Sequence, residues 1–403
     1  MGFPSRQAVI AGVYLTRQAR KLDKTPIELE IESLKGALDD AGLTLADVDG
    51  FATMDAHSPV GGADDPLYFW AEQLGQKPIG LMEIGQASGA LAKMAVAIAA
   101  GMCETAVVVA GGYIPPGATT DFATGGLLNP SKAPVPESAP VVGEWDYNIF
   151  GGSRAAFYAA WARRYMHEFK ATPEDLAQVA VTFRHHATLT GSSVMGSRGE
   201  LTVDEVVNSR MIASPLHLYD CALQTEGGWG IVMTTAERAK DLRKKPVYVL
   251  GGAEGAYIDR YNNIPNPWFP SAGGAIRRCA DRAFAMAGVT RDDIDVAGLY
   301  DCFTITVLRD LEECGFCEIG DAPAYVREGN IALGGRMPVN THGGLLSHSH
   351  QGRPDGFHTI DVVQQLRGEV EPERQVPRAK IGLSLSQGIS THGGGGVLIM
   401  GVD

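Results

Sequence analysis

The sequence has no uninterrupted apolar run of about 20 residues, the length that a membrane-spanning helix needs. No apolar segment follows Met1, so we expect no secretory leader and a soluble, cytoplasmic protein. Positively charged residues are also few: the sequence has 34 Lys and Arg against 47 Asp and Glu, which gives a net charge of −13. This balance argues against nucleic acids and anionic membranes as main partners. It does not exclude a phosphorylated ligand, which a local basic pocket could still bind.

Cysteine is scarce as well. Six cysteines in 403 residues do not make a disulfide framework. Cys314 and Cys317 have the spacing of a redox pair or of half a zinc site, but no second pair accompanies them. They follow the apolar positions of a predicted helix, Val307, Leu308 and Leu311, as a helix end would. We therefore expect buried thiols there rather than a metal or redox centre.

A nine-residue segment occurs twice. Ala41–Asp49, AGLTLADVD, recurs as Ala287–Asp295, AGVTRDDID, 246 residues further on. Each copy follows a helical pattern of apolar residues and runs into a short apolar strand. The first of these helices begins with a capping box, Thr25–Glu28, with proline at the first helical position. This repeat predicts two duplicated halves related by a pseudo-twofold axis.

The predicted halves are residues 1–246 and 247–403. Helices alternate with short apolar strands in both, which predicts an α/β fold with helices covering the sheets. Residues 113–218 interrupt the first half with a proline-rich start followed by two helical segments. An insertion of this length in a compact fold usually covers a binding site.

We place the chemistry in Asn340–Gly352, NTHGGLLSHSHQG, where His342, His348 and His350 lie within nine residues. Glycines let the backbone approach a ligand closely, and imidazoles suit proton transfer near neutral pH. The alternative is a surface loop whose histidines only form hydrogen bonds. The three histidines could also chelate a metal, but no carboxylate or thiolate partner is evident, so we expect none.

Four segments together resemble the thiolase superfamily over nearly the whole chain. They are Ala162–Glu168 (ARRYMHE), Tyr300–Phe303 (YDCF), Gly343–His350 (GGLLSHSH) and Gly393–Gly396. The likeness is closest to the sterol-carrier-protein-type thiolases and the related steroid-side-chain aldolases. It implies a layered α/β/α/β/α sandwich of two duplicated halves with a loop-domain insertion. It also puts His350 on the histidine of the thiolase GHP motif.

The first glycine loop departs from the thiolase pattern. Thiolases carry their acyl-accepting cysteine there, typically as CASGG, whereas this chain reads QASGA from Gln86 to Ala90. An amide cannot form a thioester intermediate. The second thiolase cysteine is also absent, and His392 lies near its place. Ordinary thiolysis is therefore not expected, although Ser88 or Cys302 as a substitute nucleophile stays open.

The resemblance then implies a CoA-thioester aldolase, which cleaves a β-hydroxyacyl-CoA into a ketone or aldehyde and a shorter acyl-CoA. The aldolase branch has tyrosine at the position of Tyr300 and a second tyrosine where this chain has His350. We expect Tyr300 and His350 to transfer the protons; a free tyrosine has a pKa of about 10, so it needs a cationic or donor neighbour to act as a base. The other predicted site residues donate to the enolate oxygen or line the substrate site; they are His342, His392, Gln86, Ser88, Asp301, Gly394 and Gly395.

Two other functions stay open. The chain could be a thiolase-like acyltransferase with an unusual nucleophile, or a non-catalytic subunit that binds an acyl-CoA or lipid. The resemblance further implies no cofactor besides the CoA of the substrate. It implies a homodimer, and a small zinc-ribbon/OB-fold partner that would complete a heterotetramer.

Overall fold

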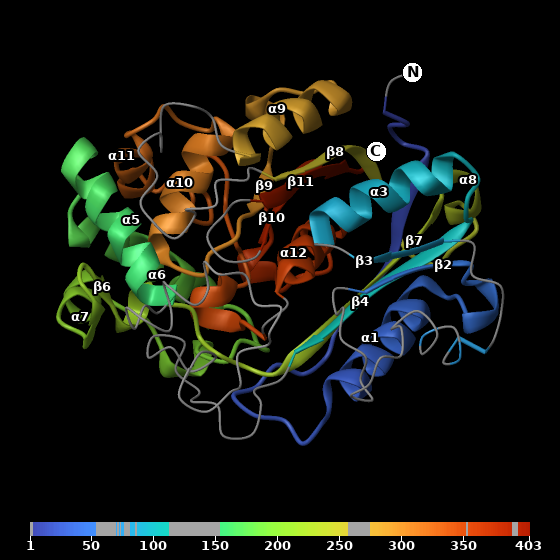
Figure 1. Ribbon diagram of the computed structural model, residues 1–403, viewed down its shortest axis with the longest axis horizontal. Coiled ribbons are helices and arrows are strands. Elements are labelled where there is room, and N and C mark those ends of the chain that lie inside the picture. The colour runs from blue at the N-terminus through green and yellow to red at the C-terminus, as the bar shows by residue number, and fades with distance from the viewer. Residues whose placement is uncertain are drawn as a thin grey trace, which may run out of the picture.

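The computed structural model describes residues 3–53, 70, 72, 74–75, 81–84, 87–112, 154–256, 275–351, 354–388 and 394–403. Two α/β halves follow one another along the chain and pack side by side (Figure 1). Within the described ranges, no helix is long and apolar enough to cross a bilayer.

One mixed sheet runs through both halves. Its strands are β1 (Ala8–Leu15), β2 (Gly50–Thr53), β3 (Leu81–Ile84), β4 (Thr105–Gly112), β7 (Gly227–Thr235), β8 (Val247–Ala256), β9 (Val296–Gly298), β10 (Ile381–Gly388) and β11 (Gly394–Gly401). They lie in the order β3-β2-β4-β7-β1-β8-β11-β10-β9. Read outward from the centre, β1-β7-β4-β2 and β8-β11-β10-β9 repeat the same order and the same parallel or antiparallel pairings. The halves join through β1 and β8, where the described pairing covers Val9 with Tyr248 and Ile10 with Val247.

The repeated segment takes the same local structure in both halves. Helices α1 (Pro26–Ala41) and α9 (Ala275–Ala287) each end before a left-handed glycine, Gly42 at φ 74° and Gly288 at φ 67°. A capped 3₁₀ turn follows each glycine and leads into β2 or β9. The predicted duplication is thus confirmed.

A second correspondence ties these segments to the sheet. The Asp49 carboxylate accepts the Thr105 N–H at 2.8 Å at the start of β4. In the other half, Asp295 accepts the Ile381 N–H at 3.0 Å at the start of β10. The duplicated halves therefore share hydrogen bonds between segments far apart in sequence.

Helices form three layers around the two half-sheets. Helices α3 (Ala87–Ala99) and α12 (Asp355–Arg367) share one core with the inner faces of both half-sheets, including Val108 of β4 and Leu398 of β11. The neighbouring strand residues face the outer helices, because successive side chains alternate across a strand. Thus Val107 and Val109 pack with α1, whereas Val397 and Ile399 pack with α9. This arrangement confirms the predicted α/β/α/β/α sandwich.

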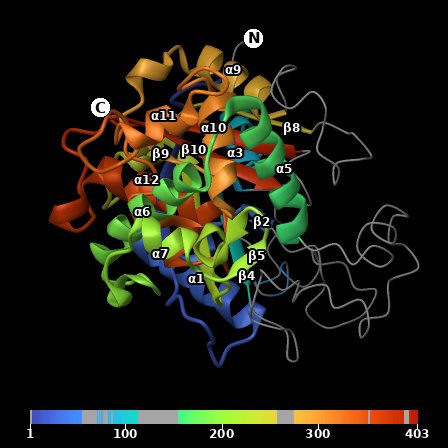
Figure 2. The same ribbon diagram turned by 90° about the vertical axis from the view of Figure 1, so that its left-hand side faces the viewer.

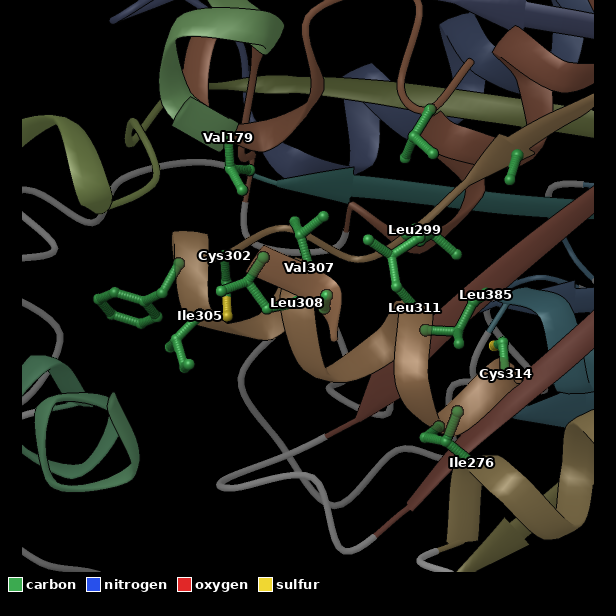
Figure 3. Close-up of a cluster of buried hydrophobic side chains, with 14 of the residues drawn as sticks. Val179, Ile276, Leu299, Cys302, Ile305, Val307, Leu308, Leu311, Cys314 and Leu385 are labelled. Carbon is green, nitrogen blue, oxygen red and sulfur yellow. The ribbon is translucent and has the colours of Figure 1, made fainter. Parts of the chain in front are cut away.

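The insertion packs against the second half. Its described helices include α5 (Arg154–Phe169), α6 (Pro173–Thr188) and α7 (Val203–Val207). Helix α6 contacts α10 (Thr304–Cys314) and α11 (Ala322–Arg327), and α5 lies beside α10 (Figure 2). The apolar cluster around α10 holds Cys302 and Cys314 (Figure 3). Helix α10 ends at Cys314 before Gly315, which confirms the predicted helix end. Cys317 is partly exposed rather than buried.

Candidate active site

The candidate site lies at one edge of the second half-sheet. Strands β9 and β10 run parallel, with Gly298 opposite Ser384, so their carboxyl ends meet at the same edge. Tyr300 and Asp301 directly follow β9, and the π-helical turn η7 (Gly344–His348) leads to His350. π-Helical turns occur frequently at functional sites.

The structure brings Tyr300 and His350 together. Their ring centroids lie 6.4 Å apart, and the ring planes cross at 67°. The backbone of His350 is fixed by Thr225, whose Oγ1 accepts the His350 N–H at 2.9 Å. A side chain on Gly112, at the end of β4, would overlap the Gln351 carbonyl oxygen. The pair therefore sits where segments of the two halves meet.

Asp301 joins the segment of Tyr300 to the turn that leads to His350. Its fully buried carboxylate accepts the Leu345 N–H at 2.9 Å and the Leu346 N–H at 3.2 Å. A side chain on Gly344, at φ 63°, would lie 2.1 Å from Asp301 Oδ2. His358 Nε2 lies 3.2 Å from the other oxygen, Oδ1. Asp301 was predicted to line the substrate site, but these contacts suit a residue that holds the turn in place.

His342 faces a different carboxylate. Its Nδ1 lies 3.2 Å from Asp361 Oδ2, and Arg374 binds the same carboxylate through Oδ1 at 2.6 Å. Burial opposes the charge on Asp361, but His342 and Arg374 hold the pKa of its carboxyl below its usual value. Burial also lowers the pKa of His342 and favours the neutral ring. A neutral ring that donates Nδ1–H to Asp361 leaves Nε2 as an acceptor, so the predicted role of His342 as a donor to the enolate does not fit.

His348 packs inside the protein. Burial lowers the pKa of its imidazole well below the usual value. Its ring centroid lies 5.6 Å from that of His342 and 4.7 Å from that of Phe357, and Nε2 is 3.4 Å from Ser192 Oγ. The loop is buried, so the alternative of a surface loop is wrong, but His348 itself only packs and lies near a hydroxyl.

Ser88 lies in a buried group of hydroxyls at the start of α3. Its N–H donates to Ser386 Oγ at 3.2 Å, and its Oγ lies 3.4 Å from Ser384 Oγ. Ser384 Oγ is in turn 2.7 Å from Thr359 Oγ1. Among the described residues, none of these partners is a base that could activate Ser88 as a nucleophile.

The glycines at the start of β11 are part of the sheet. Gly395 pairs with Gln387 of β10 on one side and Gly255 of β8 on the other. The backbone groups of a strand between two neighbours are used in its ladders, so the predicted donor role does not fit Gly395. Gly394 is the first residue of β11. Gln86 and His392 lie outside the described residues, and their roles stay predictions.

Four of the six cysteines do not offer an activated nucleophile; they are Cys103, Cys279, Cys314 and Cys317. All six are free, and burial raises the pKa of Cys103 and Cys279 to about 11. Burial likewise raises the pKa of Cys314 and Cys317. A thiol with a raised pKa stays protonated near neutral pH and reacts poorly. In the described part of the chain, no three His, Cys, Asp or Glu side chains are arranged to hold a metal ion.

Sequence reasoning missed the residues that support the histidines. His358 and Asp361 lie on α12 one helical turn apart, and each pairs with a residue distant in the chain. Two ionisable residues among the apolar residues of a predicted helix were the available signal. Asn340 was likewise missed; its side chain bonds both backbone groups of Leu299 at 2.8 Å and fixes the histidine loop beside the end of β9.

Comparisons with known proteins find relatives over almost the whole chain. Residues 271–400 match a family model described as thiolase C-terminal domain-like. A steroid side-chain-cleaving aldolase of Thermomonospora curvata is 31% identical over 98% of both chains. The chain belongs to the thiolase superfamily. Within this superfamily it falls in the branch of the CoA-thioester aldolases.

Two further relatives lie in the same branch. A 17-hydroxy-3-oxo-4-pregnene-20-carboxyl-CoA lyase of Mycobacterium tuberculosis is 32% identical over 96% of this chain and 98% of the relative. The solved structure of an Ltp2-ChsH2(DUF35) aldolase matches with a TM-score of 0.84 and 29% identity, covering 99% of this chain and 98% of that one. The predicted class of activity, a carbon–carbon lyase of the aldolase type that acts on an acyl-CoA, is thus confirmed.

Proposed function

We propose that Tyr300 and His350 carry out the two proton transfers of a retro-aldol cleavage of a β-hydroxyacyl-CoA. The observation that carries this proposal is the contact between their rings, at 6.4 Å between centroids, on the sheet edge where β9 and β10 end. Both side chains have groups that can accept and donate a proton. The absence of a cysteine before α3 and the raised pKa values of buried thiols favour a reaction without a covalent acyl-enzyme.

The reaction needs one base and one acid. One member of the pair removes the proton of the β-hydroxyl group. The bond between Cα and Cβ then breaks, its electrons form the enolate of the thioester, and the β-carbon leaves as a ketone or aldehyde. The other member protonates the enolate at Cα. The contact between the two rings lets the proton taken up by one residue return to the other before the next turnover.

The test is turnover of β-hydroxyacyl-CoA substrates, with the released carbonyl compound and the shortened acyl-CoA measured together. Tyr300→Phe and His350→Asn are each expected to lower kcat by about 10²- to 10⁴-fold, the usual contribution of a general acid or base. Tyr325→Phe and His185→Asn are the matched controls, because Tyr325 belongs to α11 and His185 pairs with Glu200 on the exposed side of α6. Full activity in both site variants would refute the assignment.

Deuterium exchange separates the two roles. An enzyme that can protonate the enolate also exchanges the α-hydrogens of the shortened acyl-CoA with solvent deuterium, without any carbonyl compound present. The variant that loses this exchange has lost the residue acting at Cα. A stable acyl label on the protein after incubation with an acyl-CoA would instead support an acyltransferase with an unusual nucleophile.

Assembly is part of the proposal. The solved relative, an Ltp2-ChsH2(DUF35) aldolase, has a name that pairs two components. By analogy this chain forms a homodimer and pairs with a small zinc-ribbon/OB-fold protein. It needs no cofactor beyond the CoA of its substrate. Co-purification from the native host, followed by measurement of the mass of the complex, tests the assembly.

A further inference from the structure

A second polar pair lies at the same edge of the sheet, in apolar surroundings. Asp310, in the middle of α10, is fully buried, and Gln387, at the end of β10, is nearly so. The two side chains are hydrogen-bonded to each other. On β10 the side chains before Gln387 on the same face are Leu383 and Leu385, which belong to the apolar core. The polar pair therefore follows the apolar side chains of Leu383 and Leu385 at the edge of the sheet where β9 and β10 end and where Tyr300 lies.

Each member of the pair keeps one polar atom without a partner. Across the described residues, Asp310 Oδ2 and Gln387 Oε1 have no hydrogen-bond partner, although both atoms are buried. The neighbouring charges do not supply one, because Arg309 and Glu313 lie 3.6 Å from each other and Arg309 stacks on Trp161. Leaving a buried polar group unsatisfied is costly, so such groups usually meet a ligand or a water molecule.

The protonation of Asp310 decides whether the two unpaired atoms, Asp310 Oδ2 and Gln387 Oε1, act as hydrogen-bond donors or acceptors. Burial raises the pKa of its carboxyl well above the usual value and so favours the neutral, protonated acid. With Oδ1 occupied by the Gln387 amide, the proton lies on Oδ2, which becomes a donor beside the acceptor Oε1. If the amide were turned around, Asp310 would donate to Gln387 and leave an acceptor beside the free N–H. Either orientation leaves one donor and one acceptor side by side.

We propose that the Asp310–Gln387 pair is a subsite that binds one hydroxyl group of the acyl chain, distant from the reacting carbon. A hydroxyl group both donates and accepts, so it can form a hydrogen bond with each of the two unpaired atoms, whereas a methyl group can form neither bond. Asp310 lies six residues after Thr304, about 9 Å along α10, so the carboxyl group of the subsite is set back from the start of the helix that follows Tyr300. The inference rests on the proposed function, because it assumes that the acyl group occupies this edge of the sheet.

The test measures binding, so that it does not depend on turnover. The probes are straight-chain acyl-CoA thioesters of graded length that lack the β-hydroxyl and cannot be cleaved, each made with a terminal hydroxyl or a terminal methyl. At one chain length the protein is expected to bind the hydroxyl form about 10-fold or more tightly. Gln387→Leu and Asp310→Leu are expected to bring this ratio to about 1. Asp310→Asn, which keeps a neutral donor, is expected to preserve it.

Two results overturn the subsite. One is equal binding of the two forms at every chain length, which would mean that a water molecule satisfies the pair. The other is a hydroxyl preference that survives both leucine variants. Failure of the proposed function would look different: no β-hydroxyacyl-CoA would be cleaved, yet the hydroxyl preference and its loss in the leucine variants would remain.

Discussion

Replacing Asp301 with asparagine tests how the catalytic pair is held together. Asparagine has nearly the same shape, but it carries no charge and presents one oxygen in place of two. Its oxygen can still accept the N–H groups of Leu345 and Leu346, and its NH₂ group can turn toward His358 Nε2. Hydrogen bonds to a charged group contribute about 1.5–3 kcal/mol each and neutral ones about 0.5–1.5 kcal/mol. Each of the two backbone N–H groups therefore loses about 1 kcal/mol when its acceptor becomes neutral, so we expect the free energy of unfolding to fall by about 2 kcal/mol.

The effect on activity should exceed the effect on folding. A displacement of about 1 Å in a catalytic group can cost about 100-fold in rate. Asp301→Asn loosens the turn that leads to His350 while Tyr300 stays on its own segment, so we expect kcat to fall about 10- to 100-fold. KM should change by less than about threefold, because the fully buried Asp301 carboxylate binds the N–H groups of Leu345 and Leu346.

A double-mutant cycle decides whether Asp301 acts through the pair. In a Tyr300→Phe background the proton-transfer pair is already disabled, so a shift of His350 has little left to disturb. There, Asp301→Asn should lower kcat by less than about threefold. Asp220→Asn is the matched control: Asp220 is also a buried carboxylate that accepts a backbone N–H, from His217 at 2.7 Å, and it contacts Thr304. Its effect should be the same in both backgrounds. An equal loss for Asp301→Asn with and without Tyr300 would refute the reasoning.

Other predictions concern stability and reactivity. Gly344→Ala should lower the free energy of unfolding by about 1–3 kcal/mol in denaturant titration, because the φ of 63° is strained for alanine and the new Cβ would meet Asp301. Burial raises the pKa of Asp220 to about 6 from 3.8, so the folded state binds more protons between these values; relative to Asp220→Asn, the parent protein should lose stability as pH rises from about 4 to about 6. Arg374→Met leaves the Asp361 carboxylate buried without its cation and should cost about 3–5 kcal/mol, with thermal unfolding as the measurement. Iodoacetamide under native conditions should leave activity unchanged, because burial raises the pKa of Cys103, Cys279, Cys314 and Cys317 and no cysteine precedes α3.

The duplicated fold could be predicted because its signals are local. A helix, a left-handed glycine and a capped turn lie within nine residues, and each depends on contacts along the chain rather than across it. The same segment therefore looks alike in sequence at Ala41–Asp49 and Ala287–Asp295 and folds alike in both halves. The order of the strands did not follow from any local pattern, and the sequence predicted only the duplication and, through the family resemblance, the layers.

The roles of the three histidines could not be predicted from their spacing. They lie within nine residues, so the sequence suggested one cluster with shared chemistry. The left-handed Gly343 and the π-helical turn after it direct them to different partners. His350 meets Tyr300, His348 packs on Phe357, and His342 pairs with Asp361, which comes from another helix.

This separation makes a further test possible within a single loop. Replacing His350 should abolish turnover in a protein that folds normally, because its ring contacts the other proton-transfer residue. Replacing His342 with asparagine should act mainly on stability, because it removes a partner of the buried Asp361 and leaves the Tyr300–His350 contact in place. Kinetics and denaturant unfolding of the two variants side by side measure this split. If the His342 variant were as stable as the parent and as inactive as the His350 variant, His342 would have a catalytic role and not a structural one.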